Sequence, residues 1–180
     1  DVNLEREFRD SRTDALIAVN ANTFWFIAII VLGFGAWDRY VDAENWWAAF
    51  VVRIWGAAII VATGLFQKLP GKMIWMPFMA KVRLITAVIT AALAAAMLDR
   101  GYGFGIAGFA VVLLTGPYIS VDGRDLLKTN LLAIAALGIV LRLAPVDRFE
   151  VIGTIVFVLL AVAISTLLGR VLESSNRRAF

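Results

Sequence analysis

Residues 151–168 read VIGTIVFVLLAVAISTLL, an almost unbroken apolar run whose polar side chains are Thr154, Ser165 and Thr166. A helix needs about 20 mostly apolar residues to cross the hydrocarbon core of a bilayer, so this run predicts a membrane span. The same helical pattern continues, without a proline or a turn cluster, into residues 169–180, GRVLESSNRRAF. The stretch therefore predicts a membrane helix that extends into the surrounding solvent as a charged helix.

The composition predicts the same class for the rest of the chain. Hydrophobic residues make up 61% of the sequence, and several further apolar runs have the length of a span. These features predict an all-α polytopic membrane protein. Cysteine and histidine are both absent from the sequence, so we expect no haem, no thiolate metal site and no cofactor in this domain. The net charge of +3 is dispersed between apolar runs, which argues against a nucleic-acid partner.

The apolar runs predict a six-helix transmembrane bundle, with spans at residues 15–37, 46–66, 79–98, 102–120, 126–143 and 151–169. An amphipathic helix over residues 4–14 precedes the first span, with Leu4, Phe8 and Ala15 on one face. Gly116 and Pro117 predict that the fourth span bends or stops near its end. Residues 170–180 are expected to begin a linker to a cytoplasmic catalytic domain.

The basic residues predict how the bundle is oriented. Six spans place both termini on one side of the membrane, together with Arg6, Arg9, Arg12, Lys68, Lys72, Lys81, Arg83, Arg124, Lys128, Arg170, Arg177 and Arg178. The opposite side receives Arg39, Arg53, Arg100, Arg142 and Arg148. Because Lys and Arg are enriched on the cytoplasmic side of membrane proteins, both termini are predicted to be cytoplasmic.

Acidic residues gather in the loops of the predicted outward side. Arg53 lies about two turns inside the second span, where it needs a partner such as Asp38 or Asp99. One interpretation is an outward pocket that binds a small or lipidic ligand, or a divalent cation, through its charged groups. Its residues would be Asp38, Asp42, Glu44, Arg53, Asp99, Asp147 and Glu150. The alternative is a set of solvated loop charges, and the metal, if any, is unknown.

Small residues recur at four-residue spacing, which permits close packing of helices within one subunit or between subunits. Ala87, Ala91 and Ala95 form one such row, and Gly101 with Gly105 and Gly103 with Ala107 form two more. The polar residues inside the spans are uncharged, and this argues against a proton-coupled transporter but leaves a channel for a neutral solute as an alternative. No nucleophile with a base and no phosphate-binding loop occurs, so these residues themselves are not expected to catalyse a reaction.

Both flanks resemble the six-span membrane domains that precede the catalytic domain of bacterial class III adenylate cyclases. Such domains open with an EREFR-like helix and close with an LERxxRRxF-like segment. The matching residues are Glu5, Arg6, Glu7, Phe8, Arg9, Leu172, Glu173, Arg177, Arg178 and Phe180, while Ser174 departs from the pattern. Similar modules also precede diguanylate cyclase domains. The resemblance implies a homodimer in the bacterial inner membrane that regulates a cytoplasmic cyclase domain of the same polypeptide, producing cAMP in the first case.

The two charged flanks also predict how a signal would leave the membrane. We expect Glu5, Glu7 or Asp10 to face Arg170, Arg177 or Arg178, because both segments leave the same side of the membrane with opposite charge. The predicted transmission residues are Glu5, Glu7, Phe8, Arg170, Leu172, Glu173, Arg177 and Arg178. Reversing the charge of Glu7 is then expected to change catalytic output in the full-length protein. A passive dimerising anchor without a ligand is the alternative.

Overall fold

The computed structural model describes residues 2–20, 23–71, 75–99, 101–120, 123–143 and 147–179. Side chains are described for these residues except 2–3, 18–19, 104–107, 110–111 and 178–179. The elements are α1 (Val2–Asn20), α2 (Thr23–Val41), α3 (Trp46–Gln67), α4 (Met76–Ala96), α5 (Gly101–Leu114), the 3₁₀ helix η2 (Gly116–Tyr118), α6 (Gly123–Leu143) and α7 (Arg148–Ala179). Within these ranges the fold is all-helical, as the composition predicts.

Five helices, α2, α3, α4, α6 and α7, are long and apolar enough to cross a membrane. The remaining predicted span, at residues 102–120, is a 14-residue helix, α5, followed by η2. The predicted end of this helix is confirmed, because α5 stops at Leu114 and Pro117 lies in η2. Proline has no backbone N–H and so cannot continue an α-helical hydrogen-bond pattern.

The break after α5 leaves a carbonyl that a side chain from another helix satisfies. The carbonyl of Leu113 would accept the N–H of residue 117 in a continuous helix, but that residue is a proline. Ser165 of α7 donates its hydroxyl to the Leu113 oxygen at 3.0 Å instead, and Asn130 of α6 lies 3.5 Å from the Ser165 oxygen. Polar side chains of this kind stabilise interrupted helices where water is excluded.

The N-terminal region differs from the sequence prediction. Helix α1 extends to Asn20, and the first apolar helix begins at Thr23, so the predicted boundary at residues 14–15 is wrong. The end of α1 is polar: Asn20 donates its side-chain amide to the carbonyl of Leu16 at 3.0 Å, and the Thr23 hydroxyl donates to the carbonyl of Asn20 at 3.1 Å. Such local side-chain bonds compete with helix continuation.

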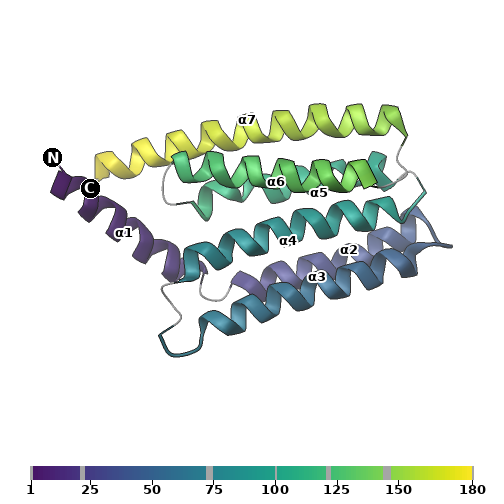
Figure 1. Cartoon of the computed structure of the whole chain (residues 1–180), viewed down its shortest axis with the longest axis horizontal. Helices are drawn as coiled ribbons and strands as arrows, with labels where there is room; N and C mark the ends of the chain where they lie inside the picture. The colour runs from purple at the N-terminus through teal and green to yellow at the C-terminus, as the bar shows by residue number, and fades with distance from the viewer. Residues whose placement is uncertain are drawn as a thin grey trace.

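The prediction of which α1 residues are buried together is also largely wrong. Phe8 is buried as expected, but Leu4 and Ala15 are exposed, and Leu16 is buried instead. Helix α1 crosses the end of the bundle at an angle (Figure 1). Its buried residues therefore depend on which neighbour each turn meets, and they do not form the straight stripe that helical periodicity alone predicts.

Helix α4 lies between the two halves of the bundle. On one side it packs against the α2–α3 pair, and on the other against α5 and α6, which in turn contact α7 (Figure 1). One cluster of buried residues joins α4 to α2 and α3 through Phe24, Ile60 and Ala87. A larger cluster joins α4 to α5, α6 and α7. Both termini lie at the same end of the bundle (Figure 1).

Glycine allows α3 to approach α2 closely. A Cβ atom at Gly64 would lie only 2.1 Å from the ring of Phe24, which is fully buried. A methyl group there has no space unless the two helices separate, and overpacking of this kind costs about 1–3 kcal/mol.

We therefore expect Gly64→Ala to lower the free energy of unfolding and the melting temperature, measured by thermal unfolding in detergent. Gly33→Ala is the matched control, because an added Cβ at Gly33 on α2 meets nothing within 4 Å. Both changes raise helix propensity equally, so equal melting temperatures for the two variants would contradict the proposed close contact.

Candidate functional site

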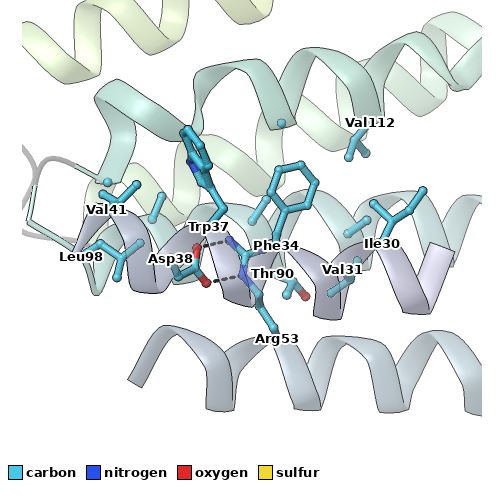
Figure 2. A pocket seen from close by; sticks show the side chains of 15 residues that line it. Ile30, Val31, Phe34, Trp37, Asp38, Val41, Arg53, Thr90, Leu98 and Val112 are labelled. Atoms are coloured by element: carbon cyan, nitrogen blue, oxygen red, sulfur yellow. Dashed lines mark hydrogen bonds and ion pairs between the residues drawn. The ribbon is translucent and has the colours of Figure 1, made fainter. Parts of the chain in front are cut away.

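A pocket of about 270 Å³ lies between α2 and α5, with α4 forming its floor (Figure 2). It occupies the half of the bundle away from the termini, where α2 ends and α5 begins. Its lining residues are Ile30, Val31, Phe34, Trp37, Asp38 and Val41 of α2, Arg53 of α3, Ala87, Thr90, Ala91 and Ala95 of α4, Leu98, and Gly101, Gly108 and Val112 of α5. Most of these side chains are apolar, so the pocket offers little beyond one charged pair for polar recognition.

Small side chains explain why this space is empty. Ala87, Ala91 and Ala95 follow one another on the face of α4 that forms the floor. On the opposite wall, an added Cβ at Gly108 would meet nothing within 4 Å. The alanine row was predicted to permit close helix packing. In the structure Ala87 and Ala95 are indeed buried, but the row also leaves room between α2 and α5.

The charged pair of the pocket is the one that the sequence predicts. Arg53 reaches from α3 to Asp38 on α2 and donates from both Nε and Nη2 to its carboxylate, with 2.7 Å between Nη2 and Oδ1 (Figure 2). The side chains of Asp38 and Arg53 are 1% and 9% exposed. The guanidinium also lies 5.4 Å from the centre of the Phe34 ring. Asp38 is thus the partner of Arg53, and the alternative partner Asp99 is not.

Asp42 has a structural role at the mouth of the pocket. Its carboxylate accepts the backbone N–H groups of Asp99, Glu44 and Asn45, and the side-chain amide of Asn45, at 2.9–3.0 Å. These bonds, that from Asp99 above all, lower the pKa of Asp42 from 3.8 to about 2. A carboxylate is favoured by hydrogen bonds to its charged form. Asp42 therefore ties the α2–α3 connection to the α4–α5 connection.

The other predicted ligand residues do not converge on the pocket. Glu44 is exposed, Asp147 accepts the N–H of Phe149 at 3.1 Å, and Glu150 lies beside Gly103. Within the described part of the chain, no three acidic side chains lie close enough to hold a metal ion. The divalent-cation interpretation is therefore not supported there, since Asp38, Asp42 and Asp147 each bind a separate guanidinium or N–H group. Asp38 and Arg53 alone among the predicted residues line the pocket.

A second polar cluster lies at the opposite end of the bundle, where the termini meet. Arg177 of α7 donates to both carboxylate oxygens of Glu5 on α1, at 2.7 and 3.1 Å, and to Glu173 at 3.0 Å. Its guanidinium lies 4.5 Å from the centre of the Phe8 ring. Glu173 also accepts the N–H of Gly123, the first residue of α6, at 3.0 Å. A carboxylate at a helix N-terminus satisfies an otherwise unpaired donor.

The predicted contact between the two flanks is confirmed for Glu5 and Arg177. Glu7, Asp10 and Arg170 are exposed, and none of them has an ion pair with another described residue. Leu172 is half-buried, and the side chain of Arg178 lies outside the described residues. A transmission role for any of these residues stays a prediction. The contact of Glu173 with α6 was not predicted, because nothing in the local sequence pairs it with Gly123.

A model of MASE8, a membrane-associated sensory domain family, matches residues 36–180. The chain belongs to the MASE8 family. No curated protein and no solved structure matches the chain. The MASE8 match contains Asp38, Arg53 and the whole of α3 to α7, and it begins after the end of α1 and near the end of α2. The sensory description fits a domain that has a pocket at one end and a charged helix end at the other.

The burial of the Asp38–Arg53 pair predicts how substitutions of these residues change the stability of this MASE8 domain. Removing one partner of a buried pair leaves an uncompensated charge and costs about 3–5 kcal/mol, whereas replacing both by apolar residues is often neutral. We expect Asp38→Leu to lower the melting temperature strongly, and the double variant Asp38→Leu/Arg53→Met to recover most of the loss. Glu44→Ala, an exposed control, should change little. A double variant as unstable as the single one would contradict the pairing.

Proposed function

We propose that this MASE8 domain anchors, dimerises and regulates a cytoplasmic adenylate cyclase domain of the same polypeptide in the bacterial inner membrane. In this proposal the described chain itself catalyses nothing and transmits a signal through α7. The observation that carries the proposal is the continuity of α7, a single helix from Arg148 to Ala179. It begins at the pocket end of the bundle and ends in the cluster formed by Glu5, Glu173 and Arg177 (Figure 1).

The packing supports a route from the pocket to this cluster. Helix α5 forms one wall of the pocket and packs more extensively against α7 than against any other helix. A change in the position of α5 would therefore act on α7 directly. At the far end, α7 contacts α1 through Arg177 and α6 through Glu173. A displacement of α7 would change those contacts.

The Glu5–Arg177 contact is weak enough to form and break during signalling. Both side chains are more than 40% exposed, and exposed ion pairs contribute about 0.2–1 kcal/mol. A free-energy difference of that size changes the ratio of two arrangements by up to about five-fold without locking either one. The resemblance of both flanks to the membrane domains of class III adenylate cyclases supports the nature of the regulated enzyme.

The direct test of the enzyme is its product. Expression of the full-length protein in a bacterium that lacks its own adenylate cyclase is expected to produce cAMP. Accumulation of cyclic di-GMP instead would favour the alternative, a diguanylate cyclase. If neither nucleotide accumulates, the proposed function is wrong.

The Glu5–Arg177 contact predicts that charge reversals at two neighbouring positions have different effects on cAMP production. Glu5→Arg should change basal or stimulated cAMP production by up to about five-fold, the ratio that follows from an exposed ion pair of at most about 1 kcal/mol, because it removes the contact with Arg177. Glu7→Arg is the matched control on the same helix. The sequence predicted an effect for it, but Glu7 is exposed and has no ion pair with another described residue, so little effect is now expected. In an Arg177→Ala background, Glu5→Arg should add nothing further. Equal effects of the two reversals would count against transmission through Glu5.

We also propose six crossings, with α5 as the fourth, and cytoplasmic termini. The absence of cysteine from this chain allows single-cysteine labelling with a membrane-impermeant maleimide. Exposed positions Glu7, Tyr118 and Ser174, changed to cysteine, should react from the cytoplasmic side, and Glu44 and Arg148 from the other. If α5 does not cross, cysteine at position 118 will react from the same side as cysteine at position 44.

A further inference from the structure

The pocket between α2 and α5 contains one polar group with unused hydrogen-bonding capacity. Arg53 is 7% exposed, and its Nε and Nη2 atoms donate to Asp38. Its Nη1 atom makes no hydrogen bond to any described residue, although the guanidinium of an arginine carries five N–H donors. Nor is Nη1 among the fully enclosed polar atoms without a partner, so it remains accessible. Because Arg53 lines the pocket, that donor is available to an occupant.

We propose that this pocket binds a neutral amphiphile, whose hydrocarbon chain lies in the pocket and whose polar end carries a carbonyl or hydroxyl oxygen that accepts an N–H from Nη1 of Arg53. The inference names the ligand class for the proposed sensory role. The binding itself does not depend on the proposed function, but its effect on a catalytic domain does.

The charge balance of the pocket selects a neutral ligand. Asp38 already neutralises Arg53, and both side chains are at least nine-tenths buried. A carboxylate or phosphate head would bring a second negative charge beside Asp38, and a cationic head a second positive charge beside Arg53. In surroundings of low dielectric constant, an unpaired charge is strongly unfavourable. A neutral acceptor oxygen meets the free donor without this cost.

The apolar lining of the pocket favours a hydrocarbon chain as the rest of the ligand. Beyond the Asp38–Arg53 pair the pocket is lined by Ile30, Ala91 and Val112, and at Gly108 the wall has no side chain. The volume of about 270 Å³ is near the lower limit of about 300 Å³ for pockets that enclose a small molecule. It therefore accommodates the head and the first part of a chain. The pocket is partly open, and α2 and α5 contact each other only sparsely, so the rest of the chain can pass between them toward the lipid.

Occupation would act on the wall that contacts the output helix. Gly108 and Val112 belong to α5, and α5 packs along α7. A chain inserted between α2 and α5 holds the two helices apart and stabilises one position of α5 relative to α7. A ligand shifts an equilibrium only through such a difference in affinity between two arrangements.

Photolabelling tests the proposal directly. The full-length protein in lipid nanodiscs is irradiated with a long-chain methyl ketone that carries a diazirine in its chain, and labelled peptides are mapped by mass spectrometry. We expect labels on the pocket segments of α2, α4 and α5. Gly108→Leu, which places a side chain in the pocket, should reduce this labelling to background. Gly33→Leu is the matched control, since Gly33 has equal space for a side chain but does not line the pocket.

Two further comparisons test the head group. Arg53→Lys keeps a cation beside Asp38 and removes the Nη1 donor, so labelling should fall by about five-fold, the factor that follows from the loss of one hydrogen bond. A carboxylate and a trimethylammonium probe of the same chain length should label the pocket more weakly than the ketone. Equal labelling by the carboxylate, or labelling that is unchanged in Gly108→Leu, would overturn the proposal.

The same samples separate this proposal from the function proposed above. If the ketone labels the pocket and Gly108→Leu abolishes the labelling, the ligand class stands, whichever nucleotide the full-length protein produces. If cAMP is produced but the pocket is not labelled, the cyclase proposal stands and the ligand class fails.

Discussion

The packing of α4 against both halves of the bundle is the contact on which the rest of the structure depends. Helix α4 contributes residues to both buried clusters, one shared with α2 and α3 and the other with α5, α6 and α7. Its alanine-rich face lets neighbouring helices approach, as small residues do in membrane proteins. The same face is too small to fill the space between α2 and α5. One property of the α4 sequence therefore produces both the tight core and the pocket.

Excluding water imposes a second constraint, which several polar residues inside the bundle meet, at least in part, in different ways. Arg53 pairs with Asp38, and Ser165 satisfies the carbonyl that Pro117 leaves without a partner. Arg83, which is 1% exposed, donates to Gln67 and to the carbonyl of Met79. These side chains join separate helices at fixed positions, and replacing any one of them leaves a polar group in surroundings that cannot solvate it. Polar residues here hold the helices in register, whereas apolar contacts supply most of the buried surface.

The two polar ends of this MASE8 domain differ in a way that suits sensing. At the pocket end, Asp38 and Arg53 are buried and Asp42 is held by several N–H groups, so the frame around the pocket is firm. At the other end, the contact of Arg177 with Glu5 is exposed and weak in free energy. In the proposed function, a displacement of α7 caused by α5 would meet little resistance from this weak contact. Helix α7 connects the two ends without interruption.

The helical class, the approximate position of five apolar helices and the end of α5 near Pro117 could be predicted from the sequence, as could the need of Arg53 for an acidic partner, for which Asp38 and Asp99 were both candidates. These follow from local properties, namely hydrophobic length, the chemistry of proline, and the cost of an unpaired charge inside a span. The sequence also indicated the contact between the charged flanks, because complementary charges leave the same side of the membrane.

The position of the pocket, in contrast, could not be predicted from the sequence. The alanine row of α4 is compatible with close packing or with a pocket, and the choice depends on how far apart α2 and α5 are held. The acidic loop residues were expected to converge, but Asp38 pairs with Arg53, and Asp42 binds the N–H of Asp99 from a distant part of the chain. The buried face of α1 depends likewise on the angle at which it crosses the bundle. Distances between helices and their crossing angles arise from the packing of all side chains together, and no single stretch of sequence contains them.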